Sequence, residues 1–254
     1  MPVMTDVQGT TVTIPTGDGD ADAYLTHPAD GKPHPGVLFY QDAYGLRPWL
    51  NGMADRLAAE GYTVLVPNVF YRRGPAPVVE LPEFIDPPSD PTIWERLGPL
   101  VHSITPEQAE RDADAYLGWM ARSPLVADGP VAVTGYCMGA RLALRTAATH
   151  PGRVAAAAGF HGGNLATEEP DSPHLGAGHI TAELYFGHAD QDPSLPEEQR
   201  RRLEDALTAA GVRHTSEVYE GAPHGYTQKD TSSYDAAAEE RHWEALKSLL
   251  RRTF

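Results

Sequence analysis

The stretch Val131-Ala132-Val133-Thr134-Gly135-Tyr136-Cys137-Met138-Gly139 decides the fold of this 254-residue chain. Its apolar start, residues 131–134, is typical of a strand that is buried on both faces. Helical spacing follows over residues 138–149, so a tight turn centred on Cys137 joins the strand to the helix. We therefore expect the Cys137 side chain to project above the edge of a sheet, at the amino terminus of a helix.

Strands and helices alternate along the rest of the chain. Alternating residues around Gly17-Asp18-Gly19-Asp20 predict an antiparallel edge hairpin at 10–15 and 22–27. Further strands are predicted at 36–40, 62–67, 154–160, 182–186 and 214–219, and further helices at 50–58, 105–120, 203–210 and 234–250. This order predicts an α/β fold: a mostly parallel sheet with helices on both faces. We find no repeat and no second domain boundary, so one domain is expected over residues 1–254.

Residues 68–103 differ from the rest because they contain seven prolines and no clear hydrophobic period. A connection of this length inside a compact domain is uncommon unless it has a function. We interpret it as a lid-like insertion, and call residues 68–103 the lid-like segment.

Composition excludes several classes of function. The chain has 20 Lys+Arg against 35 Asp+Glu, a formal net charge of −15. Such a surface repels phosphate backbones and anionic membranes, so neither nucleic acid nor a membrane is an expected partner. The single cysteine cannot form an internal disulfide, and no apolar run is long enough to span a bilayer. Residues 1–9 lack the pattern of a signal peptide, so we expect a cytoplasmic protein, either a monomer or a small homo-oligomer.

Cys137 is the candidate nucleophile. The glycines around it allow the close packing that a nucleophile elbow requires, and the amino terminus of a helix favours a thiolate. The backbone N–H of Met138 would then point at a developing oxyanion. The alternative is a small buried cysteine with only a packing role.

His224 is the candidate base, because it follows the last strand and the chain order in this arrangement is nucleophile, acid, histidine. The acid is expected after strand 182–186, where Asp190 and Asp192 compete. Hydrolases of this fold often have a carboxylate followed by two residues, an aliphatic residue and proline. Asp192, with Leu195 and Pro196, matches that spacing and Asp190 does not. We therefore predict Asp192 as the acid and Asp190 as a turn or cap residue.

The loop Gln41-Asp42-Ala43-Tyr44-Gly45 follows the first central strand. The backbone N–H of Ala43 is the second candidate oxyanion donor. Asp42 would place a carboxylate near Cys137, where it could accept the thiol proton or hold the resting site. The alternative for Asp42 is a cap for the helix that follows Arg47.

Together, the 41–45 loop, the Cys137 elbow, the Asp192 loop and His224 resemble the dienelactone hydrolase family, from about residue 36 to the C-terminus. The resemblance implies an α/β-hydrolase fold and a Cys-His-Asp triad that needs no metal. It also implies an acidic residue at the Asp42 position that helps to activate the thiol. The family usually has glutamate there, so the carboxylate of this chain reaches about one methylene less far.

Members of this family that act on carboxylated lactones hold the substrate carboxylate with arginines. Arg72 or Arg73 is a candidate for one of them. The second arginine is expected four residues after His224, but this chain has Gln228 there. We therefore expect a substrate that does not depend on a carboxylate anchor. Four aromatic residues are candidates for a substrate pocket, although each fits a core position equally well: Tyr44, Tyr136, Phe160 and Tyr226.

No cofactor is expected. His161, His174, His179 and His188 lack the paired spacing of metal ligands, and the chain has neither a phosphate-binding loop nor a dinucleotide fingerprint. The leading hypothesis is hydrolysis of a small-molecule ester or lactone through a thioester on Cys137. The alternatives are a biosynthetic thioesterase, cyclase or acyl transferase with the same site, and a non-catalytic scaffold with a redox-sensitive cysteine.

Overall fold

The computed structural model describes residues 6–254; residues 1–5, the start of the segment checked for a signal peptide, lie outside the described residues. The described residues form one eight-stranded sheet with the strand order β1-β2-β4-β3-β5-β6-β7-β8. The strands are β1 (Val7–Thr16), β2 (Gly19–Pro28), β3 (Gly36–Tyr40), β4 (Thr63–Pro67), β5 (Val131–Tyr136), β6 (Val154–Phe160), β7 (Glu183–Ala189) and β8 (His214–Tyr219). The helices are α1 (Pro48–Ala59), α2 (Thr92–His102), α3 (Pro106–Arg122), α4 (Met138–Thr149), α5 (Glu197–Ala209) and α6 (Ala236–Thr253), with short 3₁₀ turns at Tyr71–Arg73 and Pro173–His179.

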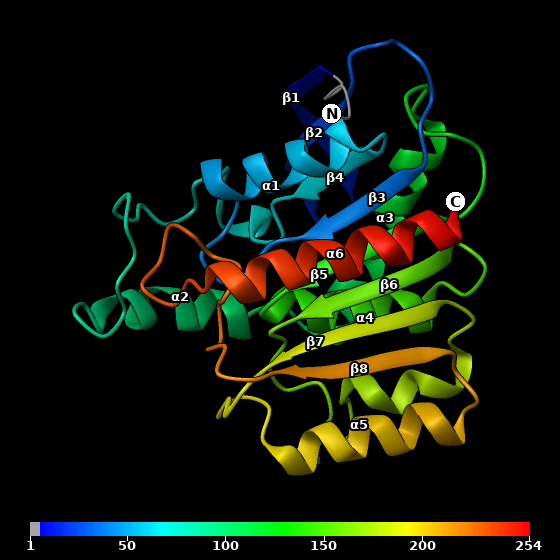
Figure 1. Ribbon diagram of the computed structural model, residues 1–254. Helices are drawn as coiled ribbons and strands as arrows, with labels where there is room; N and C mark the ends of the chain where they lie inside the picture. Colours follow the sequence, from blue (N-terminus) through cyan, green and yellow to red (C-terminus); the bar gives the residue numbers. More distant parts are fainter. Residues whose placement is uncertain (1–5) are drawn as a thin grey trace.

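Strand directions confirm the predicted α/β class. β1 and β2 form the antiparallel edge hairpin, and β2 is also antiparallel to β4. From β4 across to β8, every neighbouring pair is parallel. The carboxyl ends of these strands therefore meet at one edge of the sheet, at the left of Figure 1. Loops at such an edge are the usual place for a binding site.

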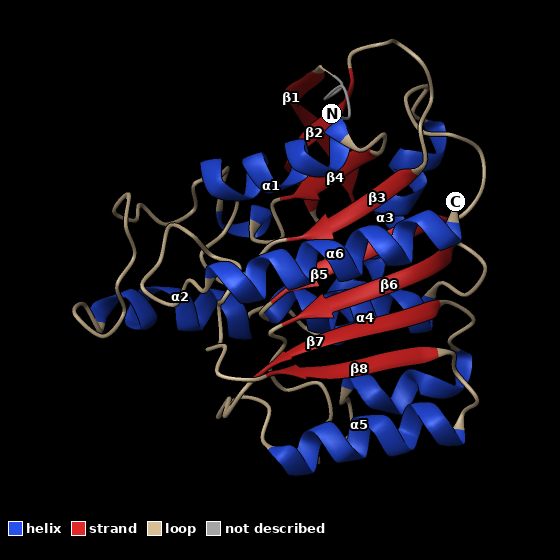
Figure 2. Cartoon of the chain, in the orientation of Figure 1, coloured by secondary structure: helices blue, strands red, loops and turns tan. Residues whose placement is uncertain are grey.

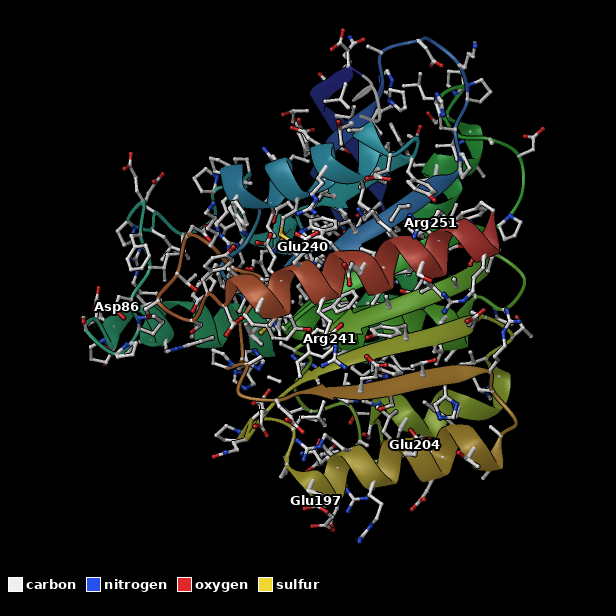
Figure 3. All side chains as sticks on the ribbon, viewed as in Figure 1. Asp86, Glu197, Glu204, Glu240, Arg241 and Arg251 are labelled. Carbon is white, nitrogen blue, oxygen red and sulfur yellow. The ribbon has the colours of Figure 1, made fainter. Side chains whose placement is uncertain are left out.

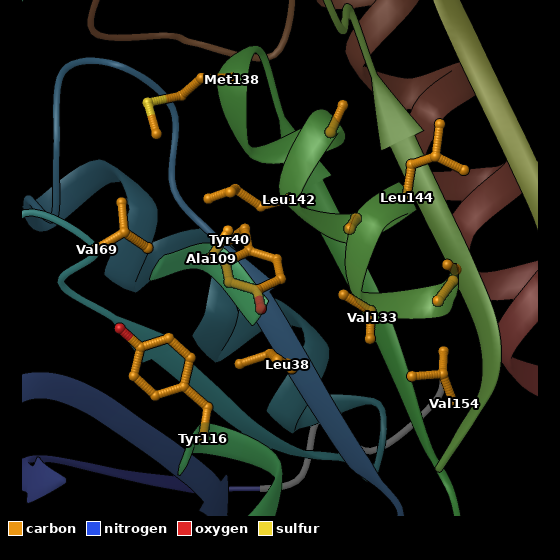
Figure 4. Packing of buried hydrophobic residues seen from close by; sticks show 14 of the residues in the cluster. Leu38, Tyr40, Val69, Ala109, Tyr116, Val133, Met138, Leu142, Leu144 and Val154 are labelled. Atoms are coloured by element: carbon orange, nitrogen blue, oxygen red, sulfur yellow. The ribbon is translucent and has the colours of Figure 1, made fainter. Parts of the chain in front are cut away.

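Helices cover both faces of the sheet, with α1 and α6 on one side and α3, α4 and α5 on the other (Figures 1 and 2). Apolar side chains of the strands fill the space on each side in two separate clusters. Figure 4 shows part of the cluster under α3 and α4, where Leu38 and Val133 of the sheet lie near Tyr116 and Leu142 of the helices. The amino end of α4 is thus fixed by packing against an apolar core.

The lid-like segment contains a helix that the sequence interpretation missed. α2 runs over Thr92–His102, beyond the carboxyl ends of the strands (Figures 1 and 2). Its buried residues Ile93, Leu97 and Leu100 have helical spacing, although Pro99 lies inside the helix. Figure 3 shows Asp86 beside α2 on the same side. Backbone hydrogen bonds from Ile85 N to Asp230 O and from Ser232 N to Ile85 O attach this segment to the region after β8.

Most other boundaries agree with the predicted ones to within a few residues. The predicted capping box of α3 is present, since Gln108 N donates to Thr105 Oγ1 and Thr105 N donates to Gln108 Oε1. β7 extends three residues further than expected, to Ala189, and α6 begins at Ala236 after an Asp235 cap. Within residues 6–254, none of the helices combines the length and the apolar character that crossing a bilayer requires.

Candidate active site

A sharp turn between β5 and α4 carries Cys137. Its φ is 54° and its ψ is −118°, a left-handed conformation that is uncommon for a residue with a side chain. A Cβ on Gly135 would lie 2.0 Å from Gly139 O, and one on Gly139 would lie 2.5 Å from Gln41 O. Only glycine fits at these two positions, because the strand, the helix and the loop after β3 approach one another so closely. The half-buried Cys137 is held at the sheet edge as predicted.

His224 is hydrogen bonded to Asp192, and Asp190 is not its partner. The distance from His224 Nδ1 to Asp192 Oδ2 is 2.6 Å. Asp190 instead accepts from Gly221 N at 3.0 Å, which makes it a turn residue. The other Asp192 oxygen, Oδ1, accepts from the hydroxyl and the backbone N–H of Ser194, at 2.7 and 2.8 Å. Both oxygens of this buried carboxylate are therefore in use, and one of them points at the imidazole.

Charge interactions link His224 to Cys137 as well. Burial alone lowers the pKa of His224, but the Cys137 charge, together with hydrogen bonds to Asp192 and to the Cys137 sulfur, raises it to about 10. Burial likewise tends to raise the pKa of Asp192, but the His224 hydrogen bond and charge and the Ser194 bonds lower it below the ordinary value. The Cys137 charge and the Asp192 carboxylate thus both favour the protonated form of the imidazole.

Asp42 lies at the same edge, but other groups occupy both of its oxygens. The fully buried carboxylate accepts from Arg47 Nη1 at 2.7 Å and Tyr44 N at 2.9 Å through Oδ1. Gln228 Nε2 donates to Oδ2 at 2.7 Å. Arg47 also binds Asp230 with Nε and Nη2. Asp42 therefore joins the loop after β3 to the turn after His224, and the Gln228 side chain is committed to this link.

The two candidate oxyanion donors come from neighbouring segments. Met138 is the first residue of α4, and Ala43 lies in the loop after β3 that packs against Gly139. Tyr44 follows Ala43; burial raises its pKa above the ordinary value, and the charges of Asp42 and Cys137 add to the effect. Its ring packs on Trp94 of α2 with the centroids 5.9 Å apart. Tyr44 is therefore the one predicted pocket aromatic that the structure brings to the site.

For the other three predicted pocket aromatics the structure favours the alternative, a position in the core. Tyr136, Phe160 and Tyr226 are each 0% exposed and belong to the core on the α6 side of the sheet. Tyr136 stacks on Phe160 and its hydroxyl is 2.8 Å from His242 Nε2, while Tyr226 donates to Gly187 O. Arg72 forms ion pairs with Asp18 and Asp112, so its guanidinium is already bound to two carboxylates.

Sequence reasoning also missed residues that the structure places at the site. Ser194 supports Asp192, and its position two residues later is the usual spacing for such a turn. Arg141 lies one helical turn after Cys137; burial lowers its pKa, and the Cys137 charge opposes that effect. The i, i+4 spacing on α4 was a signal for its position.

Two cavities flank this region. One of about 470 Å³ lies between the ends of α2 and α3 and the first turns of α4, and Met138, Arg141 and Leu142 line it. A second, of about 630 Å³, lies between the loop after β3 and residues 77–85, with Tyr44 and Trp49 in its wall. Both are large enough for a small organic ligand.

The comparisons with known proteins agree with this fold. A family model described as "Dienelactone hydrolase family" matches residues 21–254. A protein of Escherichia coli strain K12 named "Putative carboxymethylenebutenolidase" is 29% identical over 241 residues, which cover 92% of this chain and 83% of that protein. The carboxymethylenebutenolidase of Pseudomonas putida is 23% identical over 227 residues, 89% of each chain.

Among solved structures, a "Putative Dienelactone Hydrolase" from Klebsiella pneumoniae has a TM-score of 0.82 to this chain. Its sequence identity is 23%, and the match covers 96% of this chain and 98% of that one. At this identity the likeness concerns the fold. Because the family model spans nearly the whole sequence, this chain belongs to the dienelactone hydrolase family and is a hydrolase of esters or lactones.

Proposed function

We propose that this hydrolase works through a thioester on Cys137, with His224 as the acid and base and Asp192 as its partner. The observation that carries the proposal is the 2.6 Å hydrogen bond between His224 Nδ1 and Asp192, together with the pKa of His224, which the Cys137 charge and Asp192 raise to about 10. An imidazole beside the thiol can take its proton, and the thiolate is the reactive form of cysteine.

In the acylation half, the thiolate attacks the substrate carbonyl carbon and forms a carbon–sulfur bond. The carbonyl oxygen becomes an oxyanion, which the N–H groups of Met138 and Ala43 stabilise. The carbon–oxygen bond to the alcohol then breaks, and the imidazolium of His224 gives its proton to the departing alkoxide. For a lactone, the alcohol stays attached to the acyl group.

In the deacylation half, neutral His224 takes a proton from water, and the resulting hydroxide attacks the thioester carbonyl. A second oxyanion forms in the same pair of N–H groups and collapses with loss of the thiolate. The imidazolium is restored beside it. Asp192 holds Nδ1–H throughout, so that the other ring nitrogen stays available for the sulfur, the alcohol and the water.

Asp42 has a supporting role in this proposal. With both oxygens occupied by Arg47, Tyr44 N and Gln228, it holds the loop that carries the Ala43 N–H against the turn that carries His224. The family resemblance implies a part in thiol activation, which would require one of these bonds to open. The lid-like segment contacts this loop through Trp94 of α2, whose ring packs on Tyr44.

The substrate is proposed to be a neutral ester or lactone. Arg72 is bound to two carboxylates, and Gln228 is bound to Asp42, so neither can anchor a substrate carboxylate. Arg73, the other predicted anchor, is exposed, and Arg141 is a further cation on which the Cys137 charge acts. A comparison of matched aryl esters with and without a free carboxylate tests the proposal. If the carboxylated ester is preferred by about tenfold and Arg141→Gln removes the preference, the substrate is anionic instead.

Hydrolysis of a model ester by wild type and Cys137→Ala, followed with product analysis, tests the function. We expect free acid as the product from wild type and none from the variant. Transfer of the acyl group to an added alcohol in preference to water would favour the acyl-transferase alternative. Retention of full activity by purified Cys137→Ala would exclude the proposed nucleophile.

A further inference from the structure

His161 lies directly against the imidazole of His224. It follows the last residue of β6, and its side chain is 0% exposed. The two ring centroids are 5.3 Å apart, and the ring planes meet at 65° in an edge-to-face arrangement. The His224 side chain is 29% exposed, whereas His161 is fully buried. His161 is therefore part of the inner wall behind the imidazole.

The His161 ring is fixed from two directions. Its Nε2 is 2.8 Å from Thr227 Oγ1, and its ring packs edge to face with Tyr226, with centroids 4.9 Å apart. Thr227 and Tyr226 belong to the same turn as His224. The backbone N–H of His161 donates to Gly187 O of β7 at 2.8 Å. The residue thus connects the centre of the sheet to the turn that carries His224.

Two features of His161 are costly for a residue that only fills space. Its φ is 38°, in the left-handed region, and such strain is concentrated at functional sites. Its buried Nδ1 has no hydrogen-bond partner among residues 6–254. An unsatisfied buried polar atom destabilises a fold, a cost that a phenylalanine would avoid.

His161 is also neutral. Burial, and then the charges of His224 and His242, lower its pKa well below the ordinary value. The other titratable groups that face it, Tyr136 and Tyr226, are fully buried and have raised pKa values, so they are neutral as well. A neutral ring at this distance restricts the His224 imidazole without repelling its positive charge.

We propose that His161 is a positioning residue: its ring, anchored to Thr227, holds the His224 imidazole in line between Asp192 and Cys137. The inference rests on the proposed function for its catalytic consequence. The positioning itself is a property of the resting protein, because it determines how closely the imidazolium meets the thiolate.

The test uses His161→Ala, His161→Phe and Thr227→Val, with His188→Ala as the matched control. His188 is also buried, its Nε2 is 2.9 Å from Ser216 Oγ, and its Nδ1 has no partner within the described residues. Its ring stacks on Phe186, not on His224. The two alanine variants therefore leave cavities of the same size, and only one of them lies behind the imidazole.

Two readouts are measured on each variant. The first is kcat and KM for a neutral aryl ester. The second is the rate of Cys137 alkylation by iodoacetamide at about pH 6.5 relative to about pH 9.5, which reports the thiolate at neutral pH and needs no turnover. Thermal unfolding checks the stability of each protein. If the wild type hydrolyses no ester, the proposed function fails, while the alkylation ratio still tests the positioning.

For His161→Ala we expect kcat to fall at least about tenfold with KM changed less than about threefold, and the alkylation ratio to fall about fivefold or more. His161→Phe keeps the ring but loses the hydrogen bond to Thr227, as Thr227→Val does, so both variants should lie between wild type and His161→Ala in both readouts. Equal effects of His161→Ala and His188→Ala, or a His161→Ala variant that loses only thermal stability, would overturn the inference. A loss in His161→Phe as large as in His161→Ala would also overturn it. If His161→Ala does not fold, Thr227→Val decides: unchanged kcat and an unchanged alkylation ratio refute the anchoring of the ring.

Discussion

Replacing Asp192 by asparagine tests the electrostatics of the site. The bond from His224 Nδ1 to Asp192 is 2.6 Å long, and it contributes, after the Cys137 charge, to raising the pKa of His224 from 6.5 to about 10. A hydrogen bond to a charged group is worth roughly 1.5–3 kcal/mol, which corresponds to about tenfold to a hundredfold in rate. An asparagine that donates to Nδ1 also fixes the wrong tautomer, which cost about 10⁴ in a serine protease.

We therefore expect Asp192→Asn to lower kcat/KM for an aryl ester by at least about tenfold and at most about 10⁴. The pH at which Cys137 alkylation becomes fast should rise in parallel, since a less basic imidazole stabilises the thiolate less. Asp190→Asn is the matched control, because its side chain can still accept the hydrogen bond from Gly221 N. Equal effects of the two variants, or a larger effect of Asp190→Asn, would refute the assignment of Asp192.

Three further outcomes concern stability. Burial lowers the pKa of His242 from 6.5 to about 3, so below pH 6.5 the unfolded chain binds a proton that the folded chain does not. The contribution of neutral His242 to stability is therefore full above pH 6.5. It is lost as the pH falls, by up to about 1.4 kcal/mol per pH unit. Urea unfolding at pH 7 and pH 5 should show a smaller loss for His242→Gln, and an identical loss would contradict this explanation. Gly139→Ala should destabilise by about 1–3 kcal/mol in the same assay, because its Cβ would lie 2.5 Å from Gln41 O, and an unchanged midpoint would show that the elbow is less tightly packed. Arg72→Met should lower the melting temperature and leave KM unchanged, whereas a raised KM for carboxylated esters would return it to the substrate site.

Local sequence was sufficient for the elbow and for the order of the site residues. An apolar run that ends in a Gly-flanked cysteine before a helical pattern has few structural solutions, and β5, Cys137 and α4 follow it closely. The Asp192-Leu195-Pro196 spacing separated Asp192 from Asp190 because it describes a turn that leads into a helix, and α5 starts directly after Pro196. Both inferences depend on neighbouring residues alone.

Side-chain direction and distant partners were the parts that the sequence did not reveal. Tyr136 and Phe160 end adjacent strands, and a shift of one residue decides which face of a sheet such a side chain meets. Arg72 finds its carboxylates 54 and 40 residues away in sequence. The sequence did not reveal the role of His161 either, because its contacts with His224 and Thr227 join two different loops.

Helix α2 was missed for a different reason. Ile93, Leu97 and Leu100 have helical spacing, but the prolines around them, and Pro99 between the last two, concealed the pattern. The burial of these three residues against the rest of the fold outweighs the weak helix propensity of the segment.

The central claim is that Cys137 carries the acyl group, and mass spectrometry of the protein after rapid mixing with an activated ester tests it most directly. We expect one acyl group per chain on the peptide that contains Cys137, released by hydroxylamine at neutral pH as a thioester is, and none in Cys137→Ala. Turnover of the ester with an acyl group on another residue, or equal turnover by Cys137→Ala, would contradict the claim.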